Sequence, residues 1–183
     1  MSARLVSLPL LLVLTVLVAG AHAAVASSVE ETCEKACSGK HTDLEPSVGF
    51  CVSSLQAAPG SDSADARGLA AIAANLTLAN YTAAGATVKA LEQRGGWPAP
   101  VREALATCHQ RYFEMIGVVH DAIDALATKR EEDYIWDMVI VRAAPILCGT
   151  QMMAANESSM EKVTNDTFNI ASVAMLVVRK ALA

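Results

Sequence analysis

Four long segments of the chain place apolar residues at intervals of three and four positions, the spacing that puts side chains on one face of an α-helix. The segments follow one another from residue 62 to residue 183. Their apolar rows are Leu69, Ile72, Leu76, Ala79, Ala83, Ala86 and Ala90; Val101, Leu105, Cys108, Tyr112, Met115, Val119, Ala122 and Leu126; Tyr134, Met138, Val141, Pro145, Cys148 and Met152; and Met160, Val163, Thr167, Ile170, Ala174, Val177 and Ala181. No segment shows the alternation of a strand. We therefore predict an all-α fold, an antiparallel four-helix bundle with short connections.

Local signals predict where the later helices begin and bend. Thr128 and Glu131 have the spacing of a capping box, and Ser158 and Glu161 repeat it. We therefore expect the third and fourth helices to start at these pairs. Pro145 lies inside the third helix and should kink it, because proline cannot donate the backbone hydrogen bond of a helix interior.

The first 23 residues have the pattern of a signal peptide. Arg4 gives a positive start, an apolar core of about 14 residues runs from Leu5 to Val18, and Ala21-His22-Ala23 forms a small-x-small cleavage site. That core is short for a membrane span, and no later stretch is long and apolar enough to cross a bilayer. We therefore expect a secreted protein of the extracellular space.

A distinct module opens the mature chain. Residues 28–58 read as two short helices on either side of a break at Ser38-Gly39-Lys40, which predicts a helical hairpin. Pro59-Gly60-Ser61 ends the module, and the bundle occupies residues 62–183. Together, residues 28–183 should form one domain, which is long enough to bury a core.

The charge balance bears on the class of partner. Without Arg4, the mature chain keeps 13 of the 14 basic residues against 19 acidic ones, a net charge of −6. The longest basic run, Lys129-Arg130, is followed at once by Glu131-Glu132-Asp133. This balance argues against nucleic acid as a partner, and an acidic surface suits a basic protein instead.

The five cysteines indicate disulfides, since an exported chain meets an oxidising compartment. Cys108 and Cys148 both fall in apolar rows, so each should point inward, and adjacent antiparallel helices can bring them to bonding distance. Among Cys33, Cys37 and Cys51, one pair should form and one thiol should remain, whether buried, capped or used for dimerisation. A bond between Cys33 and Cys37, one helical turn apart, would constrain little.

No residue pattern of an enzyme or cofactor site is present. His109 and His120 are close to three helical turns apart, but no third ligand stands at metal spacing. The run Glu131-Glu132-Asp133 lies at a helix start, where negative charge favours the helix dipole, and we prefer that interpretation to a catalytic carboxylate pair. The sequence also lacks the nucleophile, metallopeptidase and phosphate-loop motifs. We therefore expect no catalytic residues, no cofactor and no metal.

Two further features bear on the surface. The four Asn-x-Ser/Thr acceptor sequences for N-glycosylation stand at Asn75, Asn80, Asn156 and Asn165, and Asn156 is favoured because it precedes the fourth helix in a loop. Trp97 lies in a connection rich in Gly and Pro and is the most exposed-looking large aromatic residue. It either caps the end of the bundle or anchors an interface, where tryptophan is enriched.

Several motifs, in order and spacing, resemble the plant invertase and pectin methylesterase inhibitor family. They cover about residues 30–182 and are Thr32-Cys33-Glu34-Lys35, Phe50-Cys51-Val52-Ser53-Ser54-Leu55, Ala64-Asp65-Ala66-Arg67-Gly68-Leu69-Ala70, Leu105-Ala106-Thr107-Cys108 with Tyr112, and Arg142-Ala143-Ala144 before Cys148. The resemblance implies a helical hairpin packed on a four-helix bundle, with disulfides Cys33–Cys51 and Cys108–Cys148. It also implies a cell-wall protein that blocks a secreted carbohydrate-active enzyme by covering its active-site cleft.

The resemblance also implies where the target would bind. Family members that inhibit pectin methylesterase carry acidic and polar residues on the helix after the third paired cysteine, where this chain has Gln110, Glu114 and Gly117 on one helical face. The threonine before the family's last cysteine is Leu147 here. Members that inhibit invertase often carry Pro-Lys-Phe between the first two bundle helices, whereas this chain has Trp97 and no lysine there.

We therefore expect a secreted inhibitor of pectin methylesterase. The alternatives are an inhibitor of cell-wall or vacuolar acid invertase, a divergent extracellular helical protein that inhibits nothing, and a carrier of a small apolar ligand. The rows rich in alanine argue against the carrier, because small side chains let helices approach closely and leave little cavity.

Overall fold

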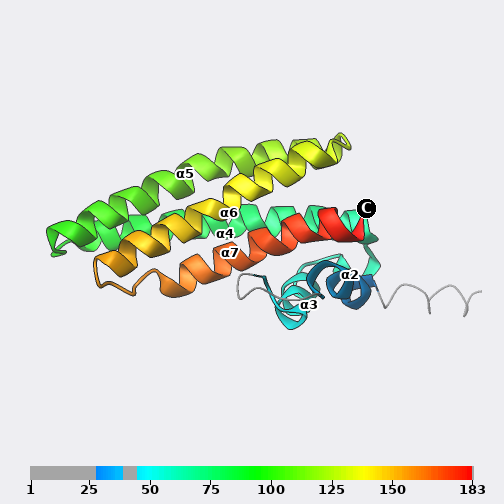
Figure 1. Cartoon of the computed structure of the whole chain (residues 1–183), viewed down its shortest axis with the longest axis horizontal. Helices are drawn as coiled ribbons and strands as arrows, with labels where there is room; N and C mark the ends of the chain where they lie inside the picture. Colours follow the sequence, from blue (N-terminus) through cyan, green and yellow to red (C-terminus); the bar gives the residue numbers. More distant parts are fainter. Residues whose placement is uncertain (1–27, 39–44, 183) are drawn as a thin grey trace, which may run out of the picture.

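The structure is a computed structural model that describes residues 28–38 and 45–182, and these residues form helices and no strand (Figure 1). The signal peptide predicted for residues 1–23 lies outside the described residues. Four long helices run antiparallel to one another and form the bundle. They are α4 (Ala66–Arg94), α5 (Ala99–Ala127), α6 (Glu131–Ala154) and α7 (Glu161–Leu176), and α7 continues into a π-helical turn, η2 (Val177–Ala181). The predicted all-α fold is confirmed.

A helical hairpin packs against the end of the bundle that holds the C-terminus (Figure 1). It consists of α2 (Ser28–Cys37) and α3 (Val48–Gln56), and the short 3₁₀ turn η1 (Ser61–Ser63) leads from it to α4. Val29, Ala36 and Leu55 are buried, so the hairpin has an apolar side that it covers by packing on α4, α7 and η2.

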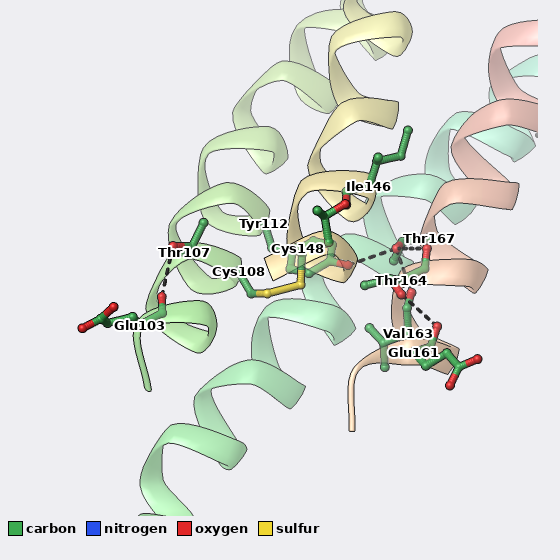
Figure 2. The surroundings of a disulfide bond; sticks show 11 residues. Glu103, Thr107, Cys108, Tyr112, Ile146, Cys148, Glu161, Val163, Thr164 and Thr167 are labelled. Atoms are coloured by element: carbon green, nitrogen blue, oxygen red, sulfur yellow. Dashed lines mark hydrogen bonds between the residues drawn. A yellow bond between two sulfur atoms is a disulfide. The ribbon is translucent and has the colours of Figure 1, made fainter. Parts of the chain in front are cut away.

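Two disulfides join these elements. Cys33 and Cys51 connect α2 to α3 with their Cα atoms 5.7 Å apart. Cys108 and Cys148 connect α5 to α6 with their Cα atoms 4.8 Å apart (Figure 2). These are the pairs that the family resemblance implies. Cys37 is the cysteine left over, and it is free and buried.

The predicted core rows are confirmed for α5, α6 and α7, and most of the row predicted for α4 is wrong. Nearly all residues predicted to face the core in α5, α6 and α7 are buried, and the others are half-buried. In α4, however, the predicted alanines Ala79, Ala83, Ala86 and Ala90 are exposed. The buried row is instead Leu69, Ala70, Ala73, Ala74, Thr77, Tyr81, Ala84 and Val88. This face buries Leu69, Tyr81 and Val88, and burying their larger apolar surface stabilises more than burying the methyl groups of the predicted alanines.

The predicted helix starts are wrong at three places. The helix expected from Asp62 begins at Ala66, where the Asp65 side chain accepts a hydrogen bond from the Gly68 amide at 2.8 Å. Helix α7 begins after Met160, which has no side-chain cap bond, so Ser158 and Glu161 form no capping box. Met160 is fully buried, so packing fixes this start.

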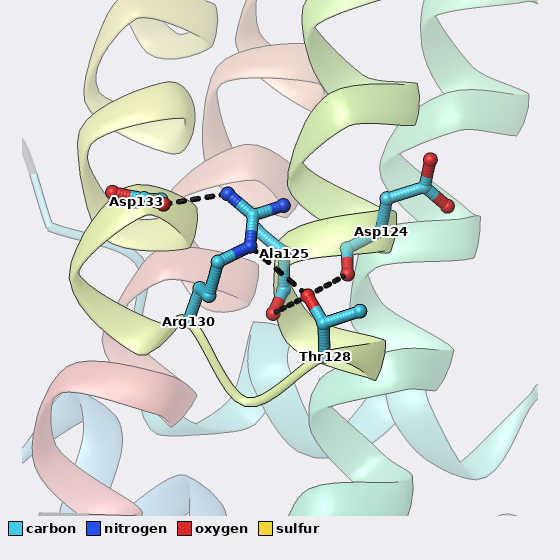
Figure 3. Close-up of polar contacts among 5 residues, drawn as sticks. All are labelled: Asp124, Ala125, Thr128, Arg130 and Asp133. Atoms are coloured by element: carbon cyan, nitrogen blue, oxygen red, sulfur yellow. Dashed lines mark hydrogen bonds and ion pairs between the residues drawn. The ribbon is translucent and has the colours of Figure 1, made fainter.

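The third misplaced start concerns Thr128, which belongs to the end of α5 and does not cap α6. Figure 3 shows its hydroxyl donating to the carbonyls of Asp124 and Ala125, at 2.7 and 3.3 Å. The last carbonyls of a helix have no partner within the helix, and the hydroxyl supplies one. Arg130 occupies the position before α6, donating from Nε to the Thr128 hydroxyl at 3.1 Å and pairing with Asp133 at 2.6 Å.

Tyrosines cross the core and tie the helices together. The Tyr112 hydroxyl on α5 shares a hydrogen bond with the Thr167 hydroxyl on α7 at 3.2 Å, beside the Cys108–Cys148 disulfide (Figure 2). The Tyr134 hydroxyl on α6 donates to the carbonyl of Ala174 at 3.0 Å. The rings of Tyr81 and Tyr112 meet edge to face, with centroids 5.4 Å apart. The interior is thus filled by side chains and held in one register.

Among the described residues, no helix combines the length and apolar character that a membrane span requires.

Candidate functional site

The three residues predicted to face a target lie together on the outer surface of α5. Gln110, Glu114 and Gly117 are all exposed. The Gln110 amide donates to one carboxylate oxygen of Glu114 at 2.8 Å, and Arg111 approaches the other at 3.4 Å. These contacts hold the Glu114 carboxylate in one orientation on the surface. A Cβ added at Gly117 would meet no atom within 4 Å outside the surrounding turns of its own helix, so this part of α5 is open.

A row of exposed apolar residues lies on α6, the helix that packs against α5. Trp136, Ile140 and Leu147 are 68%, 49% and 44% exposed, and their spacing places them on one face of the helix. α5 and α6 pack side by side and antiparallel (Figure 1). The Cys108–Cys148 bond fixes which residues of the two antiparallel helices lie at the same height. Gly117 comes nine residues after Cys108 on α5 and is therefore about level with Val139, nine residues before Cys148 on α6 and next to Ile140. We call Gln110, Glu114, Gly117, Trp136, Ile140 and Leu147 the α5–α6 face.

An acidic group borders the Trp136 end of this face. Burial, followed by the nearby charges of Asp121 and Asp133, raises the pKa of Asp137 above its ordinary value. Asp121 comes from α5, whereas Asp133 and Asp137 come from the first turns of α6. The face therefore combines an oriented carboxylate, an apolar row and an acidic border, which suits a protein partner with apolar and basic groups.

The apolar row on α6 was not predicted from the sequence. Of the two roles considered for Trp97, the structure shows the capping role, whereas the expectation that Trp97 is the most exposed large aromatic residue is wrong. Apolar residues of α6 were assigned to the core row, although Trp136, Ile140 and Leu147 follow a second helical row that was already visible in the sequence. Trp97 is half-buried, and its indole donates to the carbonyl of Leu91 at 2.7 Å, with the Arg94 guanidinium 4.1 Å from the ring centroid. Trp97 thus caps the end of α4, and Trp136 is the exposed tryptophan.

The residues weighed for metal or catalytic roles take part in ordinary contacts. His109 pairs with Glu92 at 2.8 Å and links α5 to α4. Glu131 forms an ion pair with Arg67 across the bundle, and His120 is exposed. Within the described part of the chain, no three His, Cys, Asp or Glu residues are grouped so as to hold a metal ion.

The four acceptor asparagines differ in their surroundings. Asn75 and Asn80 lie on α4, and their amides donate to the carbonyls four residues earlier, at 2.8 and 2.9 Å. Asn80 is half-buried. Asn156 is exposed in the turn after α6, with a positive φ of 54°, and Asn165 is exposed on α7.

The family of the chain follows from comparison with known proteins. The family model described as plant invertase/pectin methylesterase inhibitor matches residues 27–177, which is most of the chain. The chain belongs to the plant invertase/pectin methylesterase inhibitor family. The resemblance seen in the motifs is thereby confirmed, and the members of this family are inhibitors rather than enzymes. No curated protein matches the chain significantly.

Two solved structures share the fold of this inhibitor-family chain. A mutant form of a pectin methylesterase inhibitor from Arabidopsis superposes with a TM-score of 0.67 at 18% identity, covering 75% of this chain and 91% of that one. A pectin methylesterase inhibitor from Arabidopsis thaliana superposes with a TM-score of 0.59 at 18% identity, covering 84% of this chain and 95% of that one. At this identity the likeness establishes the hairpin-and-bundle fold and leaves the choice of target open.

Proposed function

We propose that this chain is a secreted inhibitor of a pectin methylesterase and that it acts by laying the α5–α6 face over the active-site cleft of the enzyme. The observation that carries the proposal is the pairing on this face of the oriented Glu114 carboxylate with the exposed apolar row of α6. Exposed aromatic and aliphatic residues beside polar groups are what a protein interface buries at its centre. The family membership supports the inhibitor class.

The preference for pectin methylesterase over acid invertase rests on the connection between α4 and α5. The Pro-Lys-Phe segment of invertase inhibitors is absent there, and Trp97 is held against Leu91 and Arg94. A residue tied down in this way offers little to a partner. The face is less acidic than that of pectin methylesterase inhibitors, since Glu114 is the only charged residue among Gln110, Glu114 and Gly117. It is more apolar, since Leu147 stands where the family has a threonine.

Titration of both enzyme classes with the purified mature protein at mildly acidic pH tests the proposal. We expect stoichiometric loss of pectin methylesterase activity and unchanged acid invertase activity. Loss of invertase activity alone would assign the other target. No effect on several enzymes of either class would overturn the proposal and favour a protein that inhibits nothing.

A variant at the polar part of the face makes the test specific. Glu114→Ala should weaken inhibition by about 2–5 kcal/mol, because it removes a hydrogen-bonded charge from a buried interface. Glu31→Ala is the matched control, since Glu31 is an exposed glutamate with one intrahelical ion pair, to Lys35 at 2.9 Å, on the hairpin. The helical circular-dichroism signal of both variants should equal that of the parent. Full potency of Glu114→Ala would show that the target binds elsewhere.

A further inference from the structure

A groove lies between the C-terminal half of α6 and the first half of α7. Its volume is about 630 Å³, within the range of ligand pockets in proteins. Ile146, Met153 and Phe168 supply its apolar walls, and Met153 is 71% exposed. Gly149 and Thr164 also line it, and the two helices approach closely there, since a Cβ at Gly149 would stand 3.5 Å from the Thr164 hydroxyl.

The polar groups of the groove are hydroxyls, amides and carboxylates. Thr150, Ser158 and Asn165 provide hydroxyl and amide groups, and Glu157 and Glu161 provide carboxylates. Among the described residues that line it, none is basic. Such a surface repels anions, whereas carboxylates and amides accept hydrogen bonds from sugar hydroxyls and apolar side chains cover the C–H faces of a sugar ring. The chemistry therefore favours a neutral carbohydrate.

Asn156 lines the same groove and begins the acceptor sequence Asn156-Glu157-Ser158. It is exposed in the turn between α6 and α7, and its backbone amide, not its side chain, is held by the carbonyl of Met153 at 3.0 Å. The Ser158 side chain is exposed and makes no hydrogen bond to any other described residue. The positive φ of Asn156, directly after the C-cap of α6, favours an asparagine at this position. No packing role accounts for the serine that completes the acceptor sequence.

Packing accounts for the acceptor sequences at Asn75 and Asn165, and partial burial disfavours a glycan at Asn80. Thr77, which completes the Asn75 sequence, is fully buried and donates to the carbonyl of Ala73. Thr167, which completes the Asn165 sequence, is buried and bonds the Tyr112 hydroxyl. These threonines are needed in the core whether or not their asparagines are modified. Asn80 is half-buried, so a sugar there would displace its neighbours.

We propose that Asn156 carries an N-linked glycan and that the first sugars of this glycan occupy the α6–α7 groove. The donor is a lipid-pyrophosphate-linked oligosaccharide of the secretory pathway. A bond forms between Nδ2 of Asn156 and C1 of the terminal sugar, the bond from C1 to the pyrophosphate oxygen breaks, and the lipid pyrophosphate leaves with the electron pair while the amide gives up one proton. Attachment at the rim keeps the sugars at high effective concentration over the groove.

The glycan would shield one apolar region and leave another free. Met153 and Phe168 would be covered, whereas Trp136 and Phe113, which do not line the groove, would stay exposed. Glycosylation of Asn156 requires passage through the secretory pathway and does not depend on which enzyme the chain inhibits. Its failure is thus distinguishable from failure of the proposed function.

The test compares the full chain, with its own leader, secreted from a eukaryotic host as the parent and as three variants. Ser158→Ala removes the acceptor sequence, Ser158→Thr preserves it, and Ser159→Ala changes the neighbouring serine without touching it. Glycopeptide mass spectrometry locates the glycan, and hydroxyl-radical footprinting measures the oxidation rate of Met153 and Phe168. Trp136 and Phe113 are the internal references.

We expect a glycan at Asn156 in the parent, Ser158→Thr and Ser159→Ala proteins and none there in Ser158→Ala. Met153 and Phe168 should oxidise several-fold faster in Ser158→Ala than in the other three, while the rates of Trp136 and Phe113 stay the same. An unmodified Asn156 in the secreted parent, including the case of a glycan on Asn165 alone, would overturn the inference. A glycan at Asn156 in the parent, together with the same oxidation rate of Met153 in all four proteins, would also overturn the inference.

Discussion

The Tyr81 hydroxyl on α4 donates a hydrogen bond to the Val141 carbonyl on α6 at 2.7 Å. In a regular helix that carbonyl would accept from the amide four residues later, but this position is Pro145, which has no amide hydrogen. A tyrosine from a neighbouring helix therefore supplies the partner that the proline removes. Burial raises the pKa of Tyr81, so the hydroxyl stays protonated and able to donate.

The first prediction concerns this pair. Tyr81→Phe should destabilise the protein by about 1–3 kcal/mol, because it leaves a buried carbonyl without a partner. In a Pro145→Ala background the new amide can serve that carbonyl, and the same substitution should cost clearly less. Denaturant unfolding of the four proteins gives the coupling energy as a double-mutant cycle. Equal costs in both backgrounds would mean that the hydroxyl does not compensate for the proline.

The second prediction concerns the disulfides. Replacing Cys108 and Cys148 together by alanine should lower the free energy of unfolding by about 4 kcal/mol, and replacing Cys33 and Cys51 together by about 3 kcal/mol, since the bonds join residues 40 and 18 positions apart. Denaturant unfolding of the parent and both double variants measures the loss in the free energy of unfolding. Peptide mapping of the unreduced parent should recover both links, and a link from Cys108 to any of the first three cysteines would contradict the fold.

The third prediction concerns the free thiol. Burial raises the pKa of Cys37 to about 11, so the thiol is protonated and shielded at neutral pH. Iodoacetamide should label no cysteine in the folded protein and one after unfolding. Cys37→Ala should cost less stability than Cys37→Ser, because the serine hydroxyl would be buried in an apolar site. Rapid labelling of the folded protein would show that the hairpin does not cover this residue.

The fourth prediction concerns pH. The pKa of Asp137 is raised in the folded state by burial and by Asp121 and Asp133. The folded protein therefore binds this proton more tightly than the unfolded chain does, and the contribution of Asp137 to stability rises as pH falls from neutral toward the ordinary aspartate value of 3.8. Asp137→Asn should raise the melting temperature at pH 7 and have less effect near pH 4. Asp62→Asn, at an exposed aspartate of η1, is the control, and an equal shift in both variants would argue against the effect.

The sequence predicted most of the fold because large apolar residues mark the core rows of α5, α6 and α7. Tyr112 and Met138 leave little choice of face, since exposing them would cost much of the burial energy. In α4 the many alanines fit either face almost equally, so the predicted row was misplaced and the inward position of Tyr81 was missed. The capping box at Thr128 failed because the tight turn at Lys129, whose φ is 60°, leaves Thr128 on the preceding helix.

The candidate site was predictable only in part. The family motifs located Gln110, Glu114 and Gly117, which the structure places together on the exposed side of α5. The apolar row of α6 was not recognised, because a second apolar row on a helix looks like a wider core until the neighbouring helices are placed. The α6–α7 groove requires two helices to be positioned and has no sequence pattern of its own.

Inhibition by a variant that blocks the α5–α6 face tests the central claim most directly. Gly117→Arg adds a long, charged side chain where no atom lies within 4 Å, so the fold should accommodate it. Gly85→Arg is the matched control, because Gly85 is also helical, lies on α4 and has no atom within 4 Å of an added Cβ. Both variants should keep or slightly exceed the parent's stability, since arginine is a better helix former than glycine. We predict that Gly117→Arg loses inhibition of pectin methylesterase while Gly85→Arg keeps the inhibition constant of the parent; equal potency of the two variants would contradict the assignment of this face.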